Sequence, residues 1–135
     1  MGSRAPDFNL RNEQNKLVSL KEFSGDWSLL CFYNNKCLNR TDSLIYNVPK
    51  ATSMLGDSLR TVFIYTEPEP ENDNLVLPYP TVNVHLQAKG FWAESIIKKY
   101  GVEMYPYFVL IDPEGIIRYS KATDISGAIM FFNNK

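Results

Sequence analysis

The stretch WSLLCFYNNKCLNR, residues 27–40, decides the fold that this sequence predicts. Residues 27–33 are apolar on both alternations, which is typical of a strand buried on both faces of a parallel sheet. Polar residues follow at 34–36, and Cys37 stands where an apolar pattern with helical spacing begins. The segment therefore predicts a central strand that leads into a long helix, with a thiol at the amino end of that helix.

The chain after Cys37 completes a βαβ unit. Apolar side chains recur at helical spacing until Gly56, and Pro49 is expected to kink this helix. Residues 59–65, LRTVFIY, form a second β-rich run without polar alternation. Strand, helix and strand in this order predict an α/β domain with a right-handed crossover.

The flanking segments add strands and helices to this unit. Toward the amino end, residues 5–10 and 17–20 are separated by a polar stretch, which predicts a β-hairpin. Residues 66–74 are acidic and rich in proline, so we expect a surface excursion there, and 81–86 is expected to add a short strand.

The carboxyl-terminal third predicts a helix, a hairpin and a last helix. The helix covers residues 91–100 and stops at Gly101, and the hairpin strands 107–111 and 116–119 flank an Asp-Pro-Glu-Gly turn. Asp124 is expected to cap the last helix, which carries Ile125, Ala128, Ile129, Phe131 and Phe132 over one face of the sheet.

Composition excludes several classes of function. The net charge of −1 comes from 14 basic and 15 acidic residues that are scattered along 135 positions, so no basic stripe suits nucleic acid. No apolar run approaches the ~20 residues of a membrane span. Cys31 and Cys37 are too few for a disulfide scaffold and lack the partners of a zinc site, so we expect neither a metal nor a cofactor. Residues 1–3 look like an expression remnant, and 4–135 are expected to form one domain.

Three motifs in order give the chain a family resemblance. They are APDFNL followed by LVSLKEFSG, then WSLLCFYNNKCLNR, then YGVEMYPYFVLIDPEGII. The sequence resembles the thioredoxin-like TlpA/ResA group of bacterial extracytoplasmic thiol-disulfide oxidoreductases, which is related to AhpC/TSA proteins. The resemblance implies a three-layer α/β/α sandwich with a central mixed β-sheet and an N-terminal β-hairpin.

The resemblance also implies where the site lies. The family's C-x-x-C motif corresponds to Cys37-Leu38-Asn39-Arg40, so Arg40 stands in place of the second cysteine. Pro106 corresponds to the family's cis-proline, which lies beside the first cysteine and offers backbone groups to an extended peptide. Cys37, Arg40 and Pro106 are thus the expected catalytic residues, and the expected substrate-binding residues are Lys36, Leu38, Asn39, Tyr105 and Pro106.

A thiol at a helix amino end is favoured as the thiolate by the helix dipole and by free backbone N–H groups. Lys36 and Arg40 would act in the same direction. A dithiol cycle, however, needs a second thiol to resolve the mixed disulfide, and a guanidinium group does not do this. Two hypotheses stand level: a reactive monothiol, and a redox-inactive module that binds a peptide near Pro106 by backbone pairing.

A peroxiredoxin-like peroxidase ranks third. That chemistry needs one cysteine, a hydroxyl donor three residues before it and an arginine beside it, but Asn34 occupies the hydroxyl position. Cys31, in the apolar strand, is expected to be a buried and inert thiol too far from Cys37 to bridge it. His85, the single histidine, is expected to be partly exposed and without a catalytic role.

The expected partners are protein or peptide thiols and disulfides, with no nucleic acid and no membrane insertion of this domain. The resemblance implies a periplasmic or otherwise extracytoplasmic location, within a longer exported or lipid-anchored precursor. The substrate, the electron donor and the oligomeric state are left open by the sequence.

Overall fold

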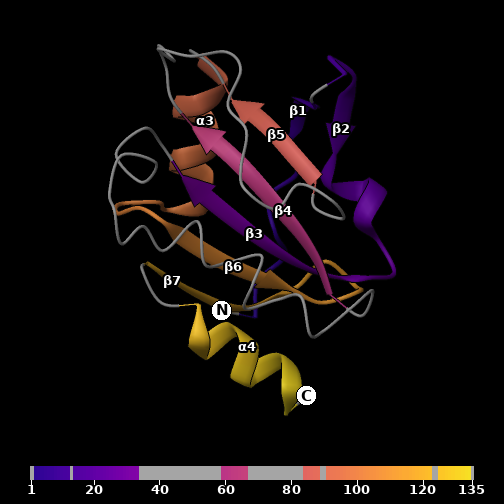
Figure 1. Ribbon diagram of the computed structural model, residues 1–135, viewed down its shortest axis with the longest axis vertical. Coiled ribbons are helices and arrows are strands. Elements are labelled where there is room, and N and C mark those ends of the chain that lie inside the picture. The colour runs from indigo at the N-terminus through magenta and orange to yellow at the C-terminus, as the bar shows by residue number, and fades with distance from the viewer. Residues whose placement is uncertain are drawn as a thin grey trace.

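The described part of the chain forms one mixed sheet of seven strands in the order β2-β1-β5-β4-β3-β6-β7 (Figure 1). The computed structural model describes residues 2–12, 14–33, 59–66, 84–88, 91–122 and 125–134. The strands are β1 (Asn9–Asn12), β2 (Leu17–Ser19), β3 (Trp27–Tyr33), β4 (Leu59–Thr66), β5 (Val84–Ala88), β6 (Tyr107–Ile111) and β7 (Ile117–Ala122). The helices are η1 (Leu20–Phe23), α3 (Phe91–Tyr100) and α4 (Ser126–Asn133).

Strand β3 is an interior strand of this sheet, with β4 on one side and β6 on the other. It pairs in parallel with β4, from Trp27 opposite Leu59 to Tyr33 opposite Tyr65. On its other side it pairs antiparallel with β6, where Phe32 stands opposite Tyr107. The predictions of a doubly buried strand at 27–33 and of a parallel neighbour at 59–65 are both confirmed.

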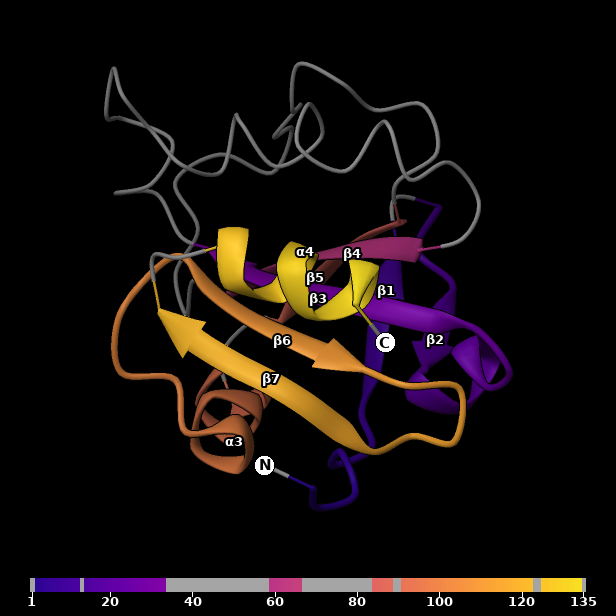
Figure 2. The same ribbon diagram turned by 90° about the horizontal axis from the view of Figure 1, so that it is seen from below.

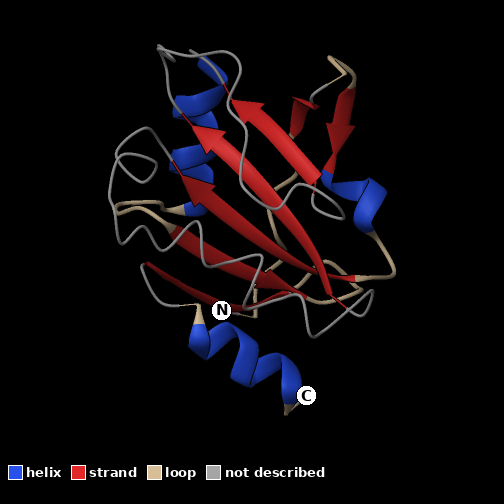
Figure 3. Cartoon of the chain, in the orientation of Figure 1, coloured by secondary structure: helices blue, strands red, loops and turns tan. Residues whose placement is uncertain are grey.

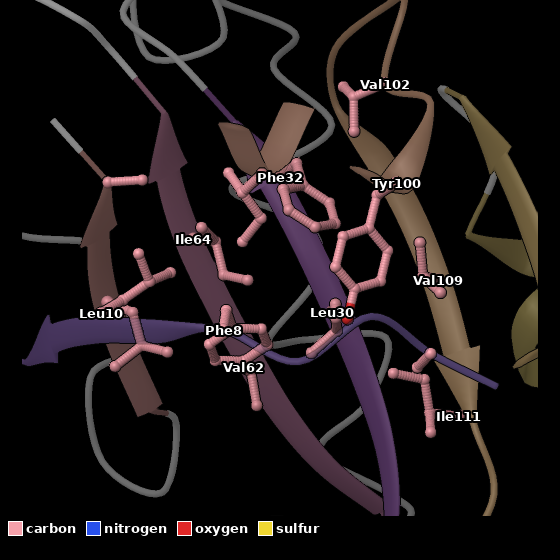
Figure 4. Packing of buried hydrophobic residues seen from close by; sticks show 14 of the residues in the cluster. Phe8, Leu10, Leu30, Phe32, Val62, Ile64, Tyr100, Val102, Val109 and Ile111 are labelled. Carbon is pink, nitrogen blue, oxygen red and sulfur yellow. The ribbon is translucent and has the colours of Figure 1, made fainter. Parts of the chain in front are cut away.

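Alternate residues of β3 build two separate cores. Leu30 and Phe32 point to one face, where α3 covers them with Ile96 and Tyr100. In Figure 4 the rings of Phe32 and Tyr100 lie side by side, with centroids 5.3 Å apart. The other face carries Leu29, Cys31 and Tyr33 together with Phe63, Phe108, Ala128 and Phe132. The last two residues come from α4, so the helices lie on opposite faces of the sheet (Figure 2).

The fold is therefore the expected thioredoxin-like α/β/α sandwich with a mixed sheet (Figure 3). The amino-terminal hairpin is also present, because β1 pairs antiparallel with β2 and Asn15 adopts a positive φ of 63° in the turn. Its first strand begins at Asn9 rather than at residue 5. Residues before it are held differently: Tyr100 donates a hydrogen bond of 2.6 Å to the carbonyl oxygen of Pro6.

Two boundaries differ from the sequence prediction in ways that affect the site. The strand expected at 81–86 is β5, Val84–Ala88, which joins β4 to the hairpin through parallel pairing with β4 and antiparallel pairing with β1. Thr66, which was assigned to the surface excursion, is the last residue of β4 and is buried. A polar residue can end a buried strand here because its hydroxyl is hydrogen-bonded.

The last helix differs from the prediction at its start and on its surface. Its N-cap position is Ile125, which provides no side-chain cap, and Asp124 lies outside the described residues. Phe131 is 41% exposed rather than packed on the sheet, whereas Ala128 and Phe132 are buried as expected. Gly127 lets this helix approach β7, because a Cβ there would lie 2.7 Å from Cζ of Tyr119.

The turn between β6 and β7 is held by one buried carboxylate. Asp112 accepts hydrogen bonds from the N–H groups of Glu114 (2.9 Å) and Ile116 (3.0 Å), and its second oxygen pairs with Nε of Arg118 at 2.8 Å. Burial alone would raise the pKa of the Asp112 carboxyl, but these donors more than offset it and hold the pKa below its usual value. Gly115, with φ of 85°, closes the turn.

Several predicted features lie outside the described residues. They are the helix after residue 37 with its kink at Pro49, the position of Cys37 at the helix amino end, and the acidic stretch from 67 to 74.

We expect the Asp112 carboxylate to stabilise the fold in a pH-dependent way. Because its pKa is lower in the folded than in the unfolded chain, its contribution is present above the unfolded value of about 3.9 and is lost as the pH falls through the folded value. Asp112→Asn should therefore lower the free energy of unfolding by about 1–2 kcal/mol at pH 7, and by less at pH 3. Urea denaturation at both pH values measures this.

The control is Asp26→Asn, which breaks an ion pair of 3.0 Å with Arg60 between two half-exposed side chains. It should change the free energy of unfolding by less than about 1 kcal/mol at pH 7. Equal losses in the two variants would contradict the role assigned to Asp112.

We expect Gly127→Ala to destabilise the protein, although alanine is the better helix former. The added Cβ would overlap the ring of Tyr119 and should lower the free energy of unfolding by about 1–3 kcal/mol. Urea denaturation tests this, with the exposed Met130→Ala on the same helix as a control that should change stability by less than about 0.5 kcal/mol. A stabilised Gly127→Ala variant would show that α4 does not approach β7 so closely.

Candidate functional site

The carboxyl end of β3 meets the amino end of β6, and this junction is the candidate site. Since Phe32 pairs with Tyr107, the residue before Tyr107 stands opposite the last residue of β3. That residue is Pro106, and the Tyr105–Pro106 peptide bond is cis. The sheet thus brings the cis-proline beside Tyr33, from which the chain continues toward Cys37.

The loop that carries Pro106 is fixed at its start by the end of α3. Gly101 takes a positive φ of 67° there, and its N–H donates to the carbonyl oxygen of Lys98 at 3.3 Å. Val102 then donates to Ile97 at 3.0 Å and buries its side chain in the core beneath α3. A glycine that ends a helix in this way directs the following residues along a defined path.

The outer part of the same loop is accessible. Met104 is 61% exposed, Glu103 is exposed, and Tyr105 is half-buried, whereas Pro106 is buried. The ring of Tyr105 contacts both hydrophobic cores. The loop therefore presents its exposed residues immediately beside a cis peptide that is anchored from below.

A pair of hydroxyl groups ties this loop to the ends of two strands. The Thr66 hydroxyl lies 3.0 Å from the Tyr105 hydroxyl and 3.3 Å from the carbonyl oxygen of Tyr33. Because the Thr66 hydroxyl has one proton and the carbonyl can only accept, Thr66 donates to Tyr33 and accepts from Tyr105. One buried side chain thus links β3, β4 and the Pro106 loop.

Aromatic rings pack beneath the junction on the α4 face. The ring of Tyr33 lies 5.3 Å from that of Tyr65 and 6.3 Å from that of Phe63, in tilted and edge-on arrangements. All three side chains are buried. Such pairs give a stiff packing surface under the end of β3.

Cys31 lies in the middle of β3 and is fully buried, as predicted. It forms no disulfide, and burial raises its pKa well above the ordinary value of a thiol. A thiol of this kind is a poor nucleophile because it is neither ionised nor accessible. Cys37 lies outside the described residues, so the prediction that Cys31 is too far from it to form a disulfide stays a prediction.

The structure describes Tyr105 and Pro106 and brings them together at the junction. The other predicted site residues, Lys36, Cys37, Leu38, Asn39 and Arg40, lie outside the described residues. His85 belongs to β5, where it pairs with Phe63. Sequence reasoning missed Thr66, although a hydroxyl directly after the apolar run Val62 to Tyr65 was a visible signal.

Within the described ranges, no group of three or more His, Cys, Asp or Glu side chains could hold a metal ion. No helix of the described chain has the length and apolar character to cross a membrane. A small cavity of about 140 Å³ lies at the amino end of β3, beside Ser28 and Phe23, and so at the opposite end of the strand from Pro106.

Comparison with known proteins agrees with this architecture. The model of the AhpC/TSA family matches residues 1–66. Among curated proteins, none matches the sequence of this chain. The chain is thus a thioredoxin-like domain whose amino-terminal part matches the AhpC/TSA family.

Solved structures from bacteria share the fold over nearly the whole chain. One is the thioredoxin domain of a thiol-disulfide oxidoreductase from Bacteroides vulgatus, with a TM-score of 0.72, 18% identity, and coverage of 97% of this chain and 96% of that one. Another is the pneumococcal exposed lipoprotein thioredoxin from Streptococcus pneumoniae, with a TM-score of 0.69, 17% identity, and coverage of 96% of this chain and all of that one.

A peroxiredoxin shares the fold to a similar degree. The reduced 2-Cys peroxiredoxin of Plasmodium vivax has a TM-score of 0.70 and 19% identity, with coverage of 99% of this chain and 94% of that one. The thioredoxin fold is common to all three proteins and to this chain.

We expect Cys31 to be unreactive in the folded protein. Iodoacetamide at pH 8 should leave Cys31 unlabelled under native conditions and should label it after denaturation in guanidinium chloride, because burial both raises the pKa of this thiol and blocks access. Peptide mapping by mass spectrometry reports each cysteine separately. Rapid native labelling of Cys31 would contradict its place in the core.

Proposed function

We propose that this domain binds extended peptides or protein segments at the Pro106 junction and reacts with their disulfides through Cys37 as a monothiol. The observation that carries the proposal is the register of β6 on β3, which places the Tyr105–Pro106 segment at the end of the strand that leads to Cys37. Cys37 is four positions after Tyr33, and four residues of fully extended chain span at most about 14 Å. The covalent chain therefore keeps the thiol within reach of the junction.

The proposed reaction is one step of thiol-disulfide exchange. The Cys37 thiolate attacks one sulfur of a disulfide, a new S–S bond forms, and the other sulfur leaves as a thiolate. Lys36, which precedes Cys37 directly, and Arg40, three positions after it, are proposed to favour the ionised thiol. Pro106 and Tyr105 contribute backbone groups that pair with an extended peptide, and Leu38 and Asn39 are proposed to contact the same peptide.

Arg40 at the position of a resolving cysteine sets the limit of this chemistry. Without a second thiol there, the mixed disulfide persists until an external thiol attacks it. Cys31 is a poor substitute because it is buried in the core. The protein is thus proposed to form one mixed disulfide with its substrate, which a separate reductant then cleaves.

The location proposed for this activity is extracytoplasmic. Disulfide substrates persist in oxidising compartments, and one protein with this fold is described as an exposed lipoprotein thioredoxin. Peroxidase activity is not proposed, although the peroxiredoxin likeness exists, because Asn34 stands where that chemistry needs a hydroxyl donor.

We expect the protein to form a stable mixed disulfide with hydroxyethyl disulfide at Cys37, seen as one adduct by intact-mass spectrometry. In an insulin-reduction assay with dithiothreitol, the wild-type protein should add little to the background rate. Arg40→Cys, which restores C-x-x-C, should gain measurable activity because the second thiol resolves the intermediate.

Arg40→Ser is the matched control, since it removes the same guanidinium group without supplying a thiol. Strong insulin reduction by the wild-type protein would show that another group resolves the intermediate. A folded wild-type protein that forms no adduct, with an inert Arg40→Cys variant, would favour a module that binds peptides without exchange.

A further inference from the structure

The Thr66 hydroxyl lies between two groups that belong to opposite sides of the proposed site. On one side is the carbonyl oxygen of Tyr33, at the end of β3, and on the other is the hydroxyl of Tyr105, next to Pro106. Thr66 itself is 2% exposed, so water competes little for these hydrogen bonds. Hydrogen bonds, in addition to apolar packing, thus connect the Pro106 loop to the end of β3.

The two side chains can each lose the hydroxyl group with little change of shape. The ring of Tyr105 contacts both hydrophobic cores, and phenylalanine keeps that ring, while valine is close to threonine in size. The pairing of β6 with β3 holds the strands together independently of these side chains. Apolar packing has little directional preference, whereas a chain of hydrogen bonds selects one placement of the loop.

We propose that Thr66 and the Tyr105 hydroxyl are positioning groups that fix the Pro106 loop against the end of β3, and that this placement favours extended peptide disulfides over small disulfides. The inference rests on the proposed function for its substrate and deepens it. A peptide that pairs with the loop backbone while its disulfide meets Cys37 contacts both sides of the junction. A small disulfide meets only the thiol, so its reaction depends less on where the loop lies.

The test compares Thr66→Val, Thr66→Ser and Tyr105→Phe, all in a Cys31→Ala background that leaves one thiol. Each protein reacts with hydroxyethyl disulfide and with a ten-residue peptide whose central cysteine carries a disulfide to 2-mercaptoethanol. Intact-mass spectrometry follows the adduct at Cys37 and gives two second-order rate constants. Their ratio, peptide over small disulfide, is the readout.

Thr66→Val removes both hydrogen bonds of the Thr66 hydroxyl, and Tyr105→Phe removes one of them. We expect each variant to lower this ratio about two- to tenfold, because the loop that binds the peptide is less well positioned. Thr66→Ser keeps the hydroxyl and should retain the wild-type ratio. The double variant Thr66→Val/Tyr105→Phe should show a ratio no lower than the more affected single variant, because both changes break the same contact. An unchanged ratio in both single variants, or a Thr66→Ser variant that resembles Thr66→Val, would overturn the inference.

A second measurement tests whether the two hydroxyl groups position the loop, and it does not depend on any reaction of Cys37. Amide hydrogen exchange of residues 102–107 should accelerate in Thr66→Val and Tyr105→Phe but not in Thr66→Ser, while exchange within α4 stays unchanged. Unchanged exchange in the loop would overturn the positioning role even if the wild-type protein reacts at Cys37. Accelerated exchange in Thr66→Val and Tyr105→Phe, together with a wild-type protein that forms no adduct, would instead keep the positioning role and reject the proposed monothiol reaction.

Discussion

The structure depends on the burial of β3 on both faces and on both edges. The apolar side chains of this strand enter one of two cores on alternate faces, and its backbone pairs with β4 on one side and β6 on the other. The helices α3 and α4 are then required on opposite faces to exclude water. The same pairing of β3 with β6 brings Pro106 to the strand end that leads to Cys37, so one constraint determines both the layers and the place of the site.

The hydrogen bonds of the Thr66 hydroxyl fix the position of the Pro106 loop where the apolar packing of the sheet ends. Strand β4 is apolar from Val62 to Tyr65 and ends with the buried polar residue Thr66, whose hydroxyl is hydrogen-bonded on both sides. Tyr105 places its ring against both cores and its hydroxyl on Thr66. The loop is therefore anchored from beneath, and the exposed Met104 and Glu103 remain on its outer surface.

Much of the architecture was predictable because it follows from strong local patterns. The apolar runs at 27–33, 59–65 and 107–111 predicted central strands, and the Asp-Pro-Glu-Gly turn predicted the last hairpin. The errors lie where tertiary contacts override local pattern. Thr66 resembles the polar stretch that follows it in sequence, and its burial depends on Tyr105, which is 39 residues further along the chain. The exposure of Phe131 could not be predicted from helical spacing either, since it depends on how α4 is rotated when Gly127 meets β7.

The proposed site draws on two parts of the chain that are distant in sequence. Residue types indicate its proposed chemistry, whereas its geometry depends on how the strands pair. The reactive atom and the charges that tune it come from a short contiguous segment, residues 36–40, so residue types alone indicate what that segment can do. Peptide binding depends instead on Pro106 and Tyr105, which are distant in sequence and reach the site only through the register of β6 on β3. Under the proposed function, Arg40 at the position of a second thiol affects only the first of these requirements. Because the proposed peptide binding depends on the sheet, and the proposed exchange on one adjoining segment, a substitution at position 40 would abolish dithiol turnover and leave the junction at Pro106 in place.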